Sequence, residues 1–406
     1  MIRASQVLWK RILATLMAGS LAAGCTTLSA QDTGAAAVAE APTNRVSDLD
    51  NPTTMADLPQ TASVLEVERY RPNYTLEGCA SAPLPTADPT AKMAAAIAEA
   101  KAYSDAQKGL GLIVIRDGAV LHGSYAEGVD GSTPFASASM MKSVVALLYG
   151  IAVEEGVIGS LDDPISAYIS EWRNDSRGNI TVRQLMTMSA GLGQSNFMEI
   201  LLAPDIGKAA LAMEQVAMPD TEFAYNNAIT KVLTLALDRQ LMAQGKGTFL
   251  GFLERELWCP LGNGTARVWI DQEETARGYA GLHAGLMDYA RIGELIRRGG
   301  ELGTNQIVPA DWIAQMATSS KANAQYGLHV WLGRAHTPRR AYSATNPIKV
   351  PHAEPFEAQD IVYFDGFGGQ RVYVLPSQNM VIARFGEVNL AFDDSVIPNL
   401  LVRAAE

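Results

Sequence analysis

Strand-like segments lie near both ends of this sequence, and a long stretch of helical pattern separates them. Residues 111–128 hold two β-rich runs on either side of Asp117-Gly118, a pair that favours a tight hairpin. Residues 140–320 follow a mostly helical pattern. Three further strands are expected at 361–364, 370–375 and 380–385. This order predicts an α+β fold: the two ends build one antiparallel sheet flanked by helices, and the middle forms a helical lobe. A cleft between sheet and lobe is the natural place for a site.

The composition excludes several classes of protein. The 406 residues are 48% hydrophobic and 18% charged, which is enough for a large globular core. A formal net charge of −11 disfavours a nucleic-acid partner. The sequence has no GxxxxGK[ST] loop, HExxH helix, GxGxxG fingerprint or pair of CxxC motifs. We therefore expect neither a metal nor an organic cofactor.

The N-terminus has the pattern of an export signal. A basic start with Arg3 and Lys10 precedes a short apolar stretch at 12–23 and a run of small residues. The ending Leu-Ala-Ala-Gly-Cys resembles a bacterial lipoprotein cleavage box, in which Cys25 would carry the lipid. Ordinary signal cleavage after Ala30 is the alternative. We expect an exported, periplasmic protein that a lipid on Cys25 anchors to the outer membrane.

The chain is expected to divide into three parts. Residues 1–25 are the signal peptide, residues 26–85 a tether and N-terminal extension, and residues 86–406 the folded domain. The tether is indicated by a composition rich in Ala, Thr, Pro and Asp without apolar periodicity. An exported protein could pair Cys79 with Cys259, but the sequence alone does not bring them together.

Ser139 and Lys142 are a candidate nucleophile and its activating amine. They stand in Ser-Met-Met-Lys, which opens an apolar helical run. Residues three apart share one face of a helix, so the two side chains can meet. The N-terminus of a helix favours negative charge that develops at the serine. A lysine in an apolar pocket has a lowered pKa and can accept the serine proton. The alternative is a polar start to a buried helix.

Tyr225-Asn226-Asn227 form a second candidate element. A phenol beside a lysine ammonium is expected to lose its proton more easily than a free tyrosine. Tyr225 could then act as a general base toward Ser139 or water, and as an acid toward the leaving group. The alternative is that these residues only cap the helix that follows.

A third element is the run Gly366-Phe367-Gly368-Gly369-Gln370, directly before a strand. Glycines let a substrate lie close to a strand edge, where a backbone N–H can hold an oxyanion. The alternative is a simple tight turn.

Together these elements resemble the superfamily of serine β-lactamases and penicillin-binding proteins. They are most similar to class C β-lactamases, family VIII esterases and the 6-aminohexanoate-oligomer hydrolase group, over roughly residues 90–390. The resemblance implies a β-lactamase/transpeptidase-like fold. It also implies that Ser139 is the nucleophile, Lys142 its partner and Tyr225 the acid/base.

The resemblance extends to less certain positions. It implies supporting or oxyanion-hole roles for Asn227, Gly368, Gly369 and Gln370. Phe367 would contact substrate, and it stands where many members begin a Lys-Thr-Gly motif, so the cation that meets a β-lactam carboxylate is missing there. His283 falls at a substrate-pocket position, although a lone histidine is more often structural.

We expect a serine hydrolase that cleaves small esters or linear amides through an acyl-enzyme at Ser139. The first alternative is a class C-like β-lactamase or D,D-peptidase that acts on β-lactams or peptidoglycan, which Phe367 disfavours. The second is a binding or sensor lipoprotein of the same fold without turnover. An α/β-hydrolase is excluded as the source of esterase activity, because the sequence has no GxSxG.

Overall fold

The computed structural model describes residues 45–58, 63–79 and 82–405. Cys25 and the expected signal peptide lie outside the described residues. Among the residues described, no helix is both long and apolar enough to cross a membrane.

A six-stranded antiparallel sheet joins the two ends of the described chain, in the order β10-β13-β14-β15-β3-β4. Its strands are β3 (Gly109–Arg116), β4 (Ala119–Tyr125), β10 (Trp331–Leu332), β13 (Val362–Gly366), β14 (Gln370–Leu375) and β15 (Met380–Gly386). The N-terminal β3 pairs with the C-terminal β15, as the sequence predicted. Asp117 and Gly118 have φ of 52° and 79°, and they make the tight turn between β3 and β4.

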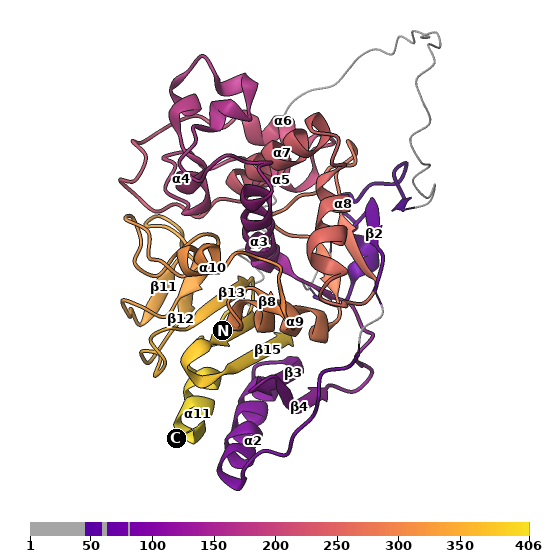
Figure 1. Cartoon of the computed structure of the whole chain (residues 1–406), viewed down its shortest axis with the longest axis vertical. Coiled ribbons are helices and arrows are strands. Elements are labelled where there is room, and N and C mark those ends of the chain that lie inside the picture. The colour runs from indigo at the N-terminus through magenta and orange to yellow at the C-terminus, as the bar shows by residue number, and fades with distance from the viewer. Residues whose placement is uncertain (1–44, 59–62, 80–81, 406) are drawn as a thin grey trace. The chain divides into compact units, whose positions relative to one another are not determined.

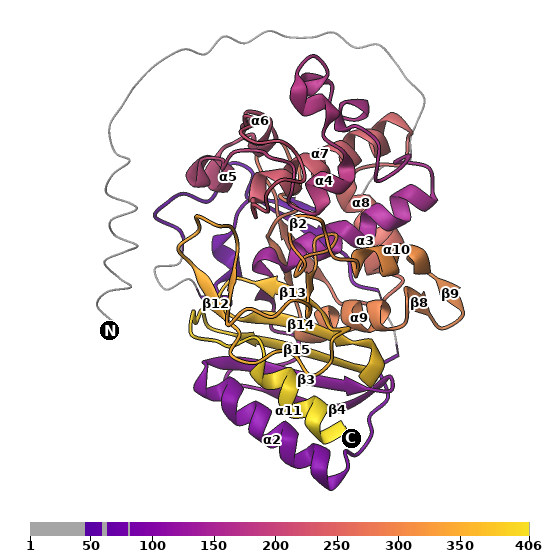
Figure 2. The same cartoon turned by 90° about the vertical axis from the view of Figure 1, so that its left-hand side faces the viewer.

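Helices cover both faces of this sheet (Figure 2). Helices α2 (Ala91–Ala106) and α11 (Val396–Ala405) lie together on one face, and α9 (Leu286–Arg297) lies on the other. Gly293 lets α9 approach closely, because a Cβ there would come within 2.8 Å of the side chains of Val372 and Val381. The helices thereby bury the apolar residues of both faces.

Helix α3 (Met141–Glu154) runs through the core between the sheet and the helical lobe (Figure 1). Every residue from Met141 to Ala152 is buried, as expected for a helix that is apolar on all sides. Trp312 of α10 (Ala310–Met316) covers Gly150 and donates its indole N–H to the Ala146 carbonyl at 3.0 Å. Packing on all sides fixes the position of the first turn of α3, which directly follows the candidate nucleophile.

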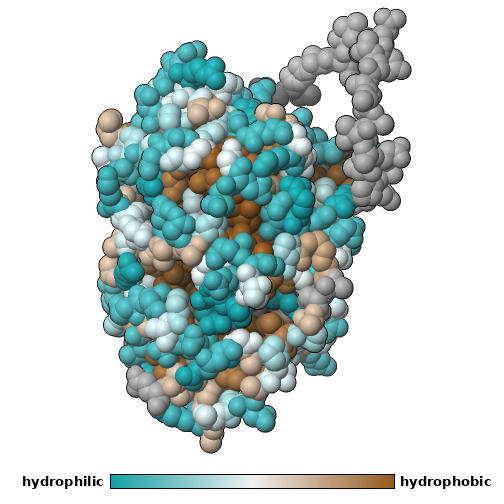
Figure 3. Space-filling model, in the orientation of Figure 1, coloured by the Kyte–Doolittle hydropathy of each residue, from teal (hydrophilic) through white to brown (hydrophobic). Residues whose placement is uncertain are grey.

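Further helices form the lobe beside α3 (Figure 1). They are α4 (Val182–Met186), α5 (Phe197–Leu202), α6 (Ile206–Leu211), α7 (Asn227–Ala243) and α8 (Phe249–Leu253). Tyr149 of α3 donates its hydroxyl to the Leu233 carbonyl of α7 at 2.8 Å, which ties these two helices together. On the face shown in Figure 3, hydrophilic residues dominate and hydrophobic ones lie mostly in hollows between them.

A second sheet, in the order β1-β2-β6-β7-β5, includes part of the expected N-terminal extension. Its strands are β1 (Val46–Ser47), β2 (Asn73–Leu76), β5 (Phe135–Ala136), β6 (Ala266–Trp269) and β7 (Leu282–Ala284). Strand β2 pairs with β6, and a disulfide joins Cys79 to Cys259 with 5.0 Å between their Cα atoms. The folded unit therefore includes described residues before 86, because these residues complete a sheet.

Two short hairpins complete the structure that is described. Strands β8 (Glu301–Leu302) and β9 (Asn305–Gln306) form one, and β11 (Arg339–Ala341) and β12 (Lys349–Pro351) form the other.

Candidate active site

Ser139 lies in a short 3-10 turn, Ala138–Met140, between strand β5 and helix α3. The chain enters this turn from the second sheet, where the Ser137 N–H donates to the Leu282 carbonyl at 2.8 Å. Ala138 has a left-handed backbone, with φ of 45°. Such a conformation costs a residue with a side chain about 1–3 kcal/mol, and it is typical of functional turns. Ser139 is therefore presented at a sharp bend and stays partly exposed.

Lys142 follows Ser139 by one helical turn and points back to it. The Lys142 Nζ lies 3.0 Å from the Ser139 Oγ, as the three-residue spacing predicted. It also lies 2.8 Å from the Asn227 Oδ1 and 3.1 Å from the Tyr279 carbonyl oxygen. A neutral amine has two N–H groups and one lone pair. If the two oxygens accept the N–H groups, the lone pair faces the serine hydroxyl.

Burial favours this neutral amine. The Lys142 side chain is 1% exposed, and burial lowers its pKa well below the usual range, while the negative charge of Asp365 acts in the opposite direction. A neutral Lys142 can accept the proton of Ser139. A serine nucleophile needs a general base, and the position of Lys142 beside Ser139 fits that role.

The Tyr225-Asn226-Asn227 stretch combines a helix cap with site residues. The Asn226 side chain caps α7, because its Oδ1 accepts the Ala228 N–H at 3.0 Å. Asn227 is the first residue of α7 and reaches Lys142. The capping role and the site role are therefore both present, on neighbouring residues.

Tyr225 lies beside the serine and the lysine, but its ionisation differs from the expectation. The Lys142 Nζ lies 4.6 Å from the centre of the Tyr225 ring. Burial raises the pKa of the Tyr225 phenol, and Asp365 adds to this, while a hydrogen bond with Ser139 partly opposes it. The expected easier loss of the proton is wrong, because burial outweighs the nearby charges that favour phenolate. A raised pKa favours the protonated phenol, which is suited to donate or relay a proton.

The glycine-rich run is a tight hairpin turn between β13 and β14. Gly368 and Gly369 have φ of 82° and 102°, which a residue with a side chain rarely adopts. A Cβ on Gly366 would lie 2.7 Å from the Ser137 carbonyl oxygen, so this strand edge passes close to the turn that holds Ser139. The Gln370 side chain is buried and holds the turn, with its Nε2 3.2 Å from the Phe367 carbonyl and its Oε1 2.9 Å from the Gly386 N–H.

His283 lies in β7, opposite Ala136 of β5. It is 1% exposed, its ring centre is 5.1 Å from that of Tyr70, and burial lowers its pKa to about 3. A neutral, buried ring fits the structural alternative raised for this residue. Contact with substrate stays a prediction.

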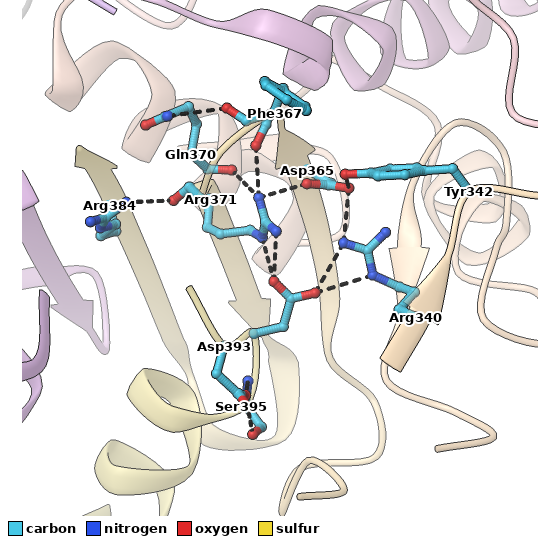
Figure 4. Close-up of polar contacts among 12 residues, drawn as sticks. Arg340, Tyr342, Asp365, Phe367, Gln370, Arg371, Arg384, Asp393 and Ser395 are labelled. Atoms are coloured by element: carbon cyan, nitrogen blue, oxygen red, sulfur yellow. Dashed lines mark hydrogen bonds and ion pairs between the residues drawn. The ribbon is translucent and has the colours of Figure 1, made fainter. Parts of the chain in front are cut away.

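Sequence reasoning missed a group of polar residues behind Tyr225. Asp365, the last residue but one of β13, affects the pKa of both Lys142 and Tyr225. Tyr342 donates its hydroxyl to Asp365 at 2.8 Å, and Arg340 pairs with the same carboxylate at 2.9 Å (Figure 4). The available signal was Asp365 itself, a charge within an otherwise apolar strand sequence.

The comparisons with known proteins agree with this geometry. A family model described as Beta-lactamase matches residues 93–395, and the chain therefore belongs to this family. Family membership and the Ser139–Lys142 contact together define a serine hydrolase of the β-lactamase fold. A comparison with curated proteins finds no match.

Solved structures show the same fold at low sequence identity. A Bacillus anthracis protein assigned as a 6-aminohexanoate-dimer hydrolase has a TM-score of 0.69 at 19% identity, over 91% of this chain and 98% of its own. A penicillin-binding protein homologue from Caulobacter crescentus has a TM-score of 0.58 at 15% identity, over 79% and 99%. A family VIII carboxylesterase has a TM-score of 0.57 at 13% identity, over 79% and 98%. These findings confirm the superfamily and the fold that the motifs indicated.

Proposed function

We propose that this protein hydrolyses small esters or linear amides through an acyl-enzyme at Ser139. The observation that carries the proposal is the contact between Ser139 and a buried Lys142 whose pKa is lowered. Names printed for structures of the same fold, a 6-aminohexanoate-dimer hydrolase and a carboxylesterase, support this substrate class.

The proposed reaction has two halves. In acylation, the Ser139 Oγ attacks the substrate carbonyl carbon and its proton passes to the neutral Lys142 Nζ. The oxyanion is held by the Ser139 backbone N–H and an N–H of the 366–370 hairpin. The tetrahedral intermediate expels an alcohol or amine, which takes its proton from the Tyr225 hydroxyl, and Lys142 reprotonates Tyr225. In deacylation, water attacks the acyl carbonyl, and its proton passes through Tyr225 and Lys142 to the Ser139 oxygen. Ser139 therefore leaves protonated.

Phe367 favours an uncharged substrate over a β-lactam. A β-lactam carries a carboxylate, and the described hairpin turn 366–370 offers no cationic side chain to meet it. One observation favours the alternative, since Lys349 lines a small cavity beside Phe367. The Lys349 Nζ is hydrogen-bonded to the Ser343 carbonyl at 3.2 Å, which reduces its availability to a ligand. β-Lactam hydrolysis therefore remains the second candidate.

Parallel initial rates test the substrate class. A short-chain nitrophenyl ester, the linear dimer of 6-aminohexanoate and a chromogenic cephalosporin are compared with wild-type protein, Ser139→Ala and Ser143→Ala. Ser143 is the matched control, because it is a nearby serine in α3 whose hydroxyl donates to the His329 carbonyl at 2.8 Å instead of contacting Lys142. We expect ester or amide turnover that Ser139→Ala reduces at least about a thousandfold and Ser143→Ala retains. Efficient turnover of the cephalosporin alone would contradict the proposal.

We also propose that the protein is exported and anchored through Cys25. The basic and apolar start of the sequence supports export, and the Cys79–Cys259 disulfide is typical of an oxidising compartment. Expression of the full chain in a Gram-negative host, followed by membrane fractionation, tests this. We expect wild-type protein in the membrane fraction and Cys25→Ala in a different fraction. An unprocessed chain that stays in the cytoplasm would contradict it.

A further inference from the structure

Four buried charges form a closed ring behind the active site. Arg340 contacts Asp365 at 2.9 Å and Asp394 at 3.0 Å, and Arg371 contacts the same two carboxylates at 2.6 Å each. All four residues are at most 3% exposed. Asp365 and Arg371 face each other across the β13–β14 hairpin, and Arg340 enters from β11 (Figure 4). The formal charges of the two arginines and two aspartates cancel, so the ring is neutral as a whole.

Tyr342 connects this ring to Tyr225 by three contacts. Its hydroxyl donates to Asp365 at 2.8 Å. Its carbonyl accepts the Tyr225 N–H at 2.9 Å, and its ring centre lies 5.3 Å from that of Tyr225. The side chain and backbone of Tyr342 thus both bear on the residue that faces Ser139.

Trp331 forms a second wall beside Tyr225 and contacts the first, with 5.9 Å between the ring centres of Trp331 and Tyr342. Its ring lies nearly parallel to that of Tyr225, with 27° between the planes and 6.0 Å between the centres. The Arg340 guanidinium lies 3.8 Å from the centre of the Trp331 ring and 5.3 Å from that of Tyr342. One cation therefore holds both aromatic walls, because each ring face attracts it.

The energetics of the ring point to a role beyond stability. Taking charged groups out of water costs several kcal/mol per ion, and a buried ion pair often stabilises a fold no more than apolar residues of similar volume. What such a ring does supply is fixed geometry, since each guanidinium is held by two carboxylates.

We propose that Tyr342 and Arg340 are positioning residues for Tyr225, which they hold over Lys142 by linking it to the ring of buried charges. This inference rests on the proposed function, because Tyr225 is the acid/base of that reaction. The Tyr342 hydroxyl fixes one wall through Asp365, and Arg340 fixes both. Loosening either contact misdirects the Tyr225 hydroxyl during proton transfer but leaves the substrate pocket in place.

Tyr342→Phe is the sharpest test, because it removes only the hydroxyl that donates a hydrogen bond to Asp365. The matched control is Tyr363→Phe, which removes a buried phenol hydroxyl that has no hydrogen-bond partner among the described residues, on the strand that carries Asp365. We expect Tyr342→Phe to lower kcat for the best ester about tenfold, with KM changed less than about twofold. Tyr363→Phe should leave both constants unchanged. Equal kcat values for Tyr342→Phe and wild type, or an equal loss in both variants, would overturn the inference.

A second readout separates this inference from the proposed function. The rate at which an organophosphonate electrophile labels Ser139 reports on the activated serine even when no substrate is turned over, and Ser139→Ala gives the background. Labelling that is slower in Tyr342→Phe than in Tyr363→Phe supports the positioning role, and equal labelling overturns it. Wild-type protein without Ser139-dependent hydrolysis would contradict the proposed function alone. Thermal unfolding of each variant identifies any loss that comes from misfolding.

Discussion

The side-chain oxygen of Asn227 lies 2.8 Å from the Lys142 Nζ and joins the first residue of α7 to the first turn of α3. The contact orients the amine, because Asn227 and the Tyr279 carbonyl together leave one direction open, toward Ser139. The Asn227 amide is neutral, so it places no charge beside the Lys142 amine. A single substitution at position 227 can change the orientation of the amine or the charge beside it.

Asn227→Asp should move the acid limb of the pH–rate profile to higher pH. In the wild type, burial lowers the Lys142 pKa, so activity falls only when the pH drops below that lowered value. A carboxylate at position 227 favours the protonated amine and raises its pKa by about 1–3 units. A protonated Lys142 cannot accept the serine proton, so activity at neutral pH decreases and recovers at higher pH. The measurement is kcat/KM of the best ester against pH.

The control for this prediction is Asn196→Asp. It adds the same charge at the exposed N-cap of α5 and should leave the acid limb where it is in the wild type. An acid limb that stays fixed in Asn227→Asp, or that moves equally in both variants, would show that Lys142 is not the titrating base.

Lys231 anchors the α7 helix one turn after Asn227, and removing the charge that pairs with it should lower the stability of the fold. Its Nζ lies 3.1 Å from the Asp271 carboxylate and 2.8 Å from the Ala276 carbonyl, and the side chains of Lys231 and Asp271 are both fully buried. Asp271→Asn leaves a buried amine without its counter-charge, which should lower the free energy of unfolding by about 3–5 kcal/mol. Urea denaturation measures this loss.

A partly exposed ion pair provides the comparison for Asp271→Asn. Glu171 and Arg239 contact at 2.8 Å, but their side chains are 43% and 35% exposed. Glu171→Gln should therefore cost less than about 1 kcal/mol. Equal losses in the two variants would mean that burial does not set the strength of the Lys231–Asp271 pair.

The Cys79–Cys259 disulfide should stabilise the protein strongly, because it closes a loop of 180 residues. Loop-closure entropy gives about 5 kcal/mol for a loop of this length, and measured values are commonly about 2–4 kcal/mol. We expect Cys79→Ser with Cys259→Ser to lower the Tm by several degrees, and reduction of the wild type to do the same. A double variant as stable as oxidised wild type would show that the bridge contributes nothing. Cys25 is left intact in these variants.

Local patterns predicted the parts of the site that depend on neighbouring residues. The spacing of Ser139 and Lys142 sufficed for their contact, since helix geometry sets it, and Asp117-Gly118 sufficed for the hairpin of β3 and β4. The order of strand and helix patterns predicted that the two ends share one sheet. The resemblance to known families tied the three motifs to one fold.

Properties that depend on distant contacts were not predictable in this way. Burial raises the pKa of Tyr225, and its aromatic neighbours Trp331 and Tyr342 lie far away in the sequence. The ring of charges needs Arg340 and Asp394 to meet across folded segments, and no local pattern encodes that meeting. The composition of residues 26–85 likewise did not predict that β2 pairs with β6, because a segment without apolar periodicity can still contribute a strand.

The most direct test of the central claim is to trap the covalent intermediate. The protein is mixed with a nitrophenyl ester, quenched in acid within milliseconds to seconds, digested and analysed by mass spectrometry. We predict an added acyl mass on the peptide that contains Ser139, which is absent from Ser139→Ala and decays as product forms. Hydrolysis that persists in Ser139→Ala, or an acyl group found on another residue, would contradict the account.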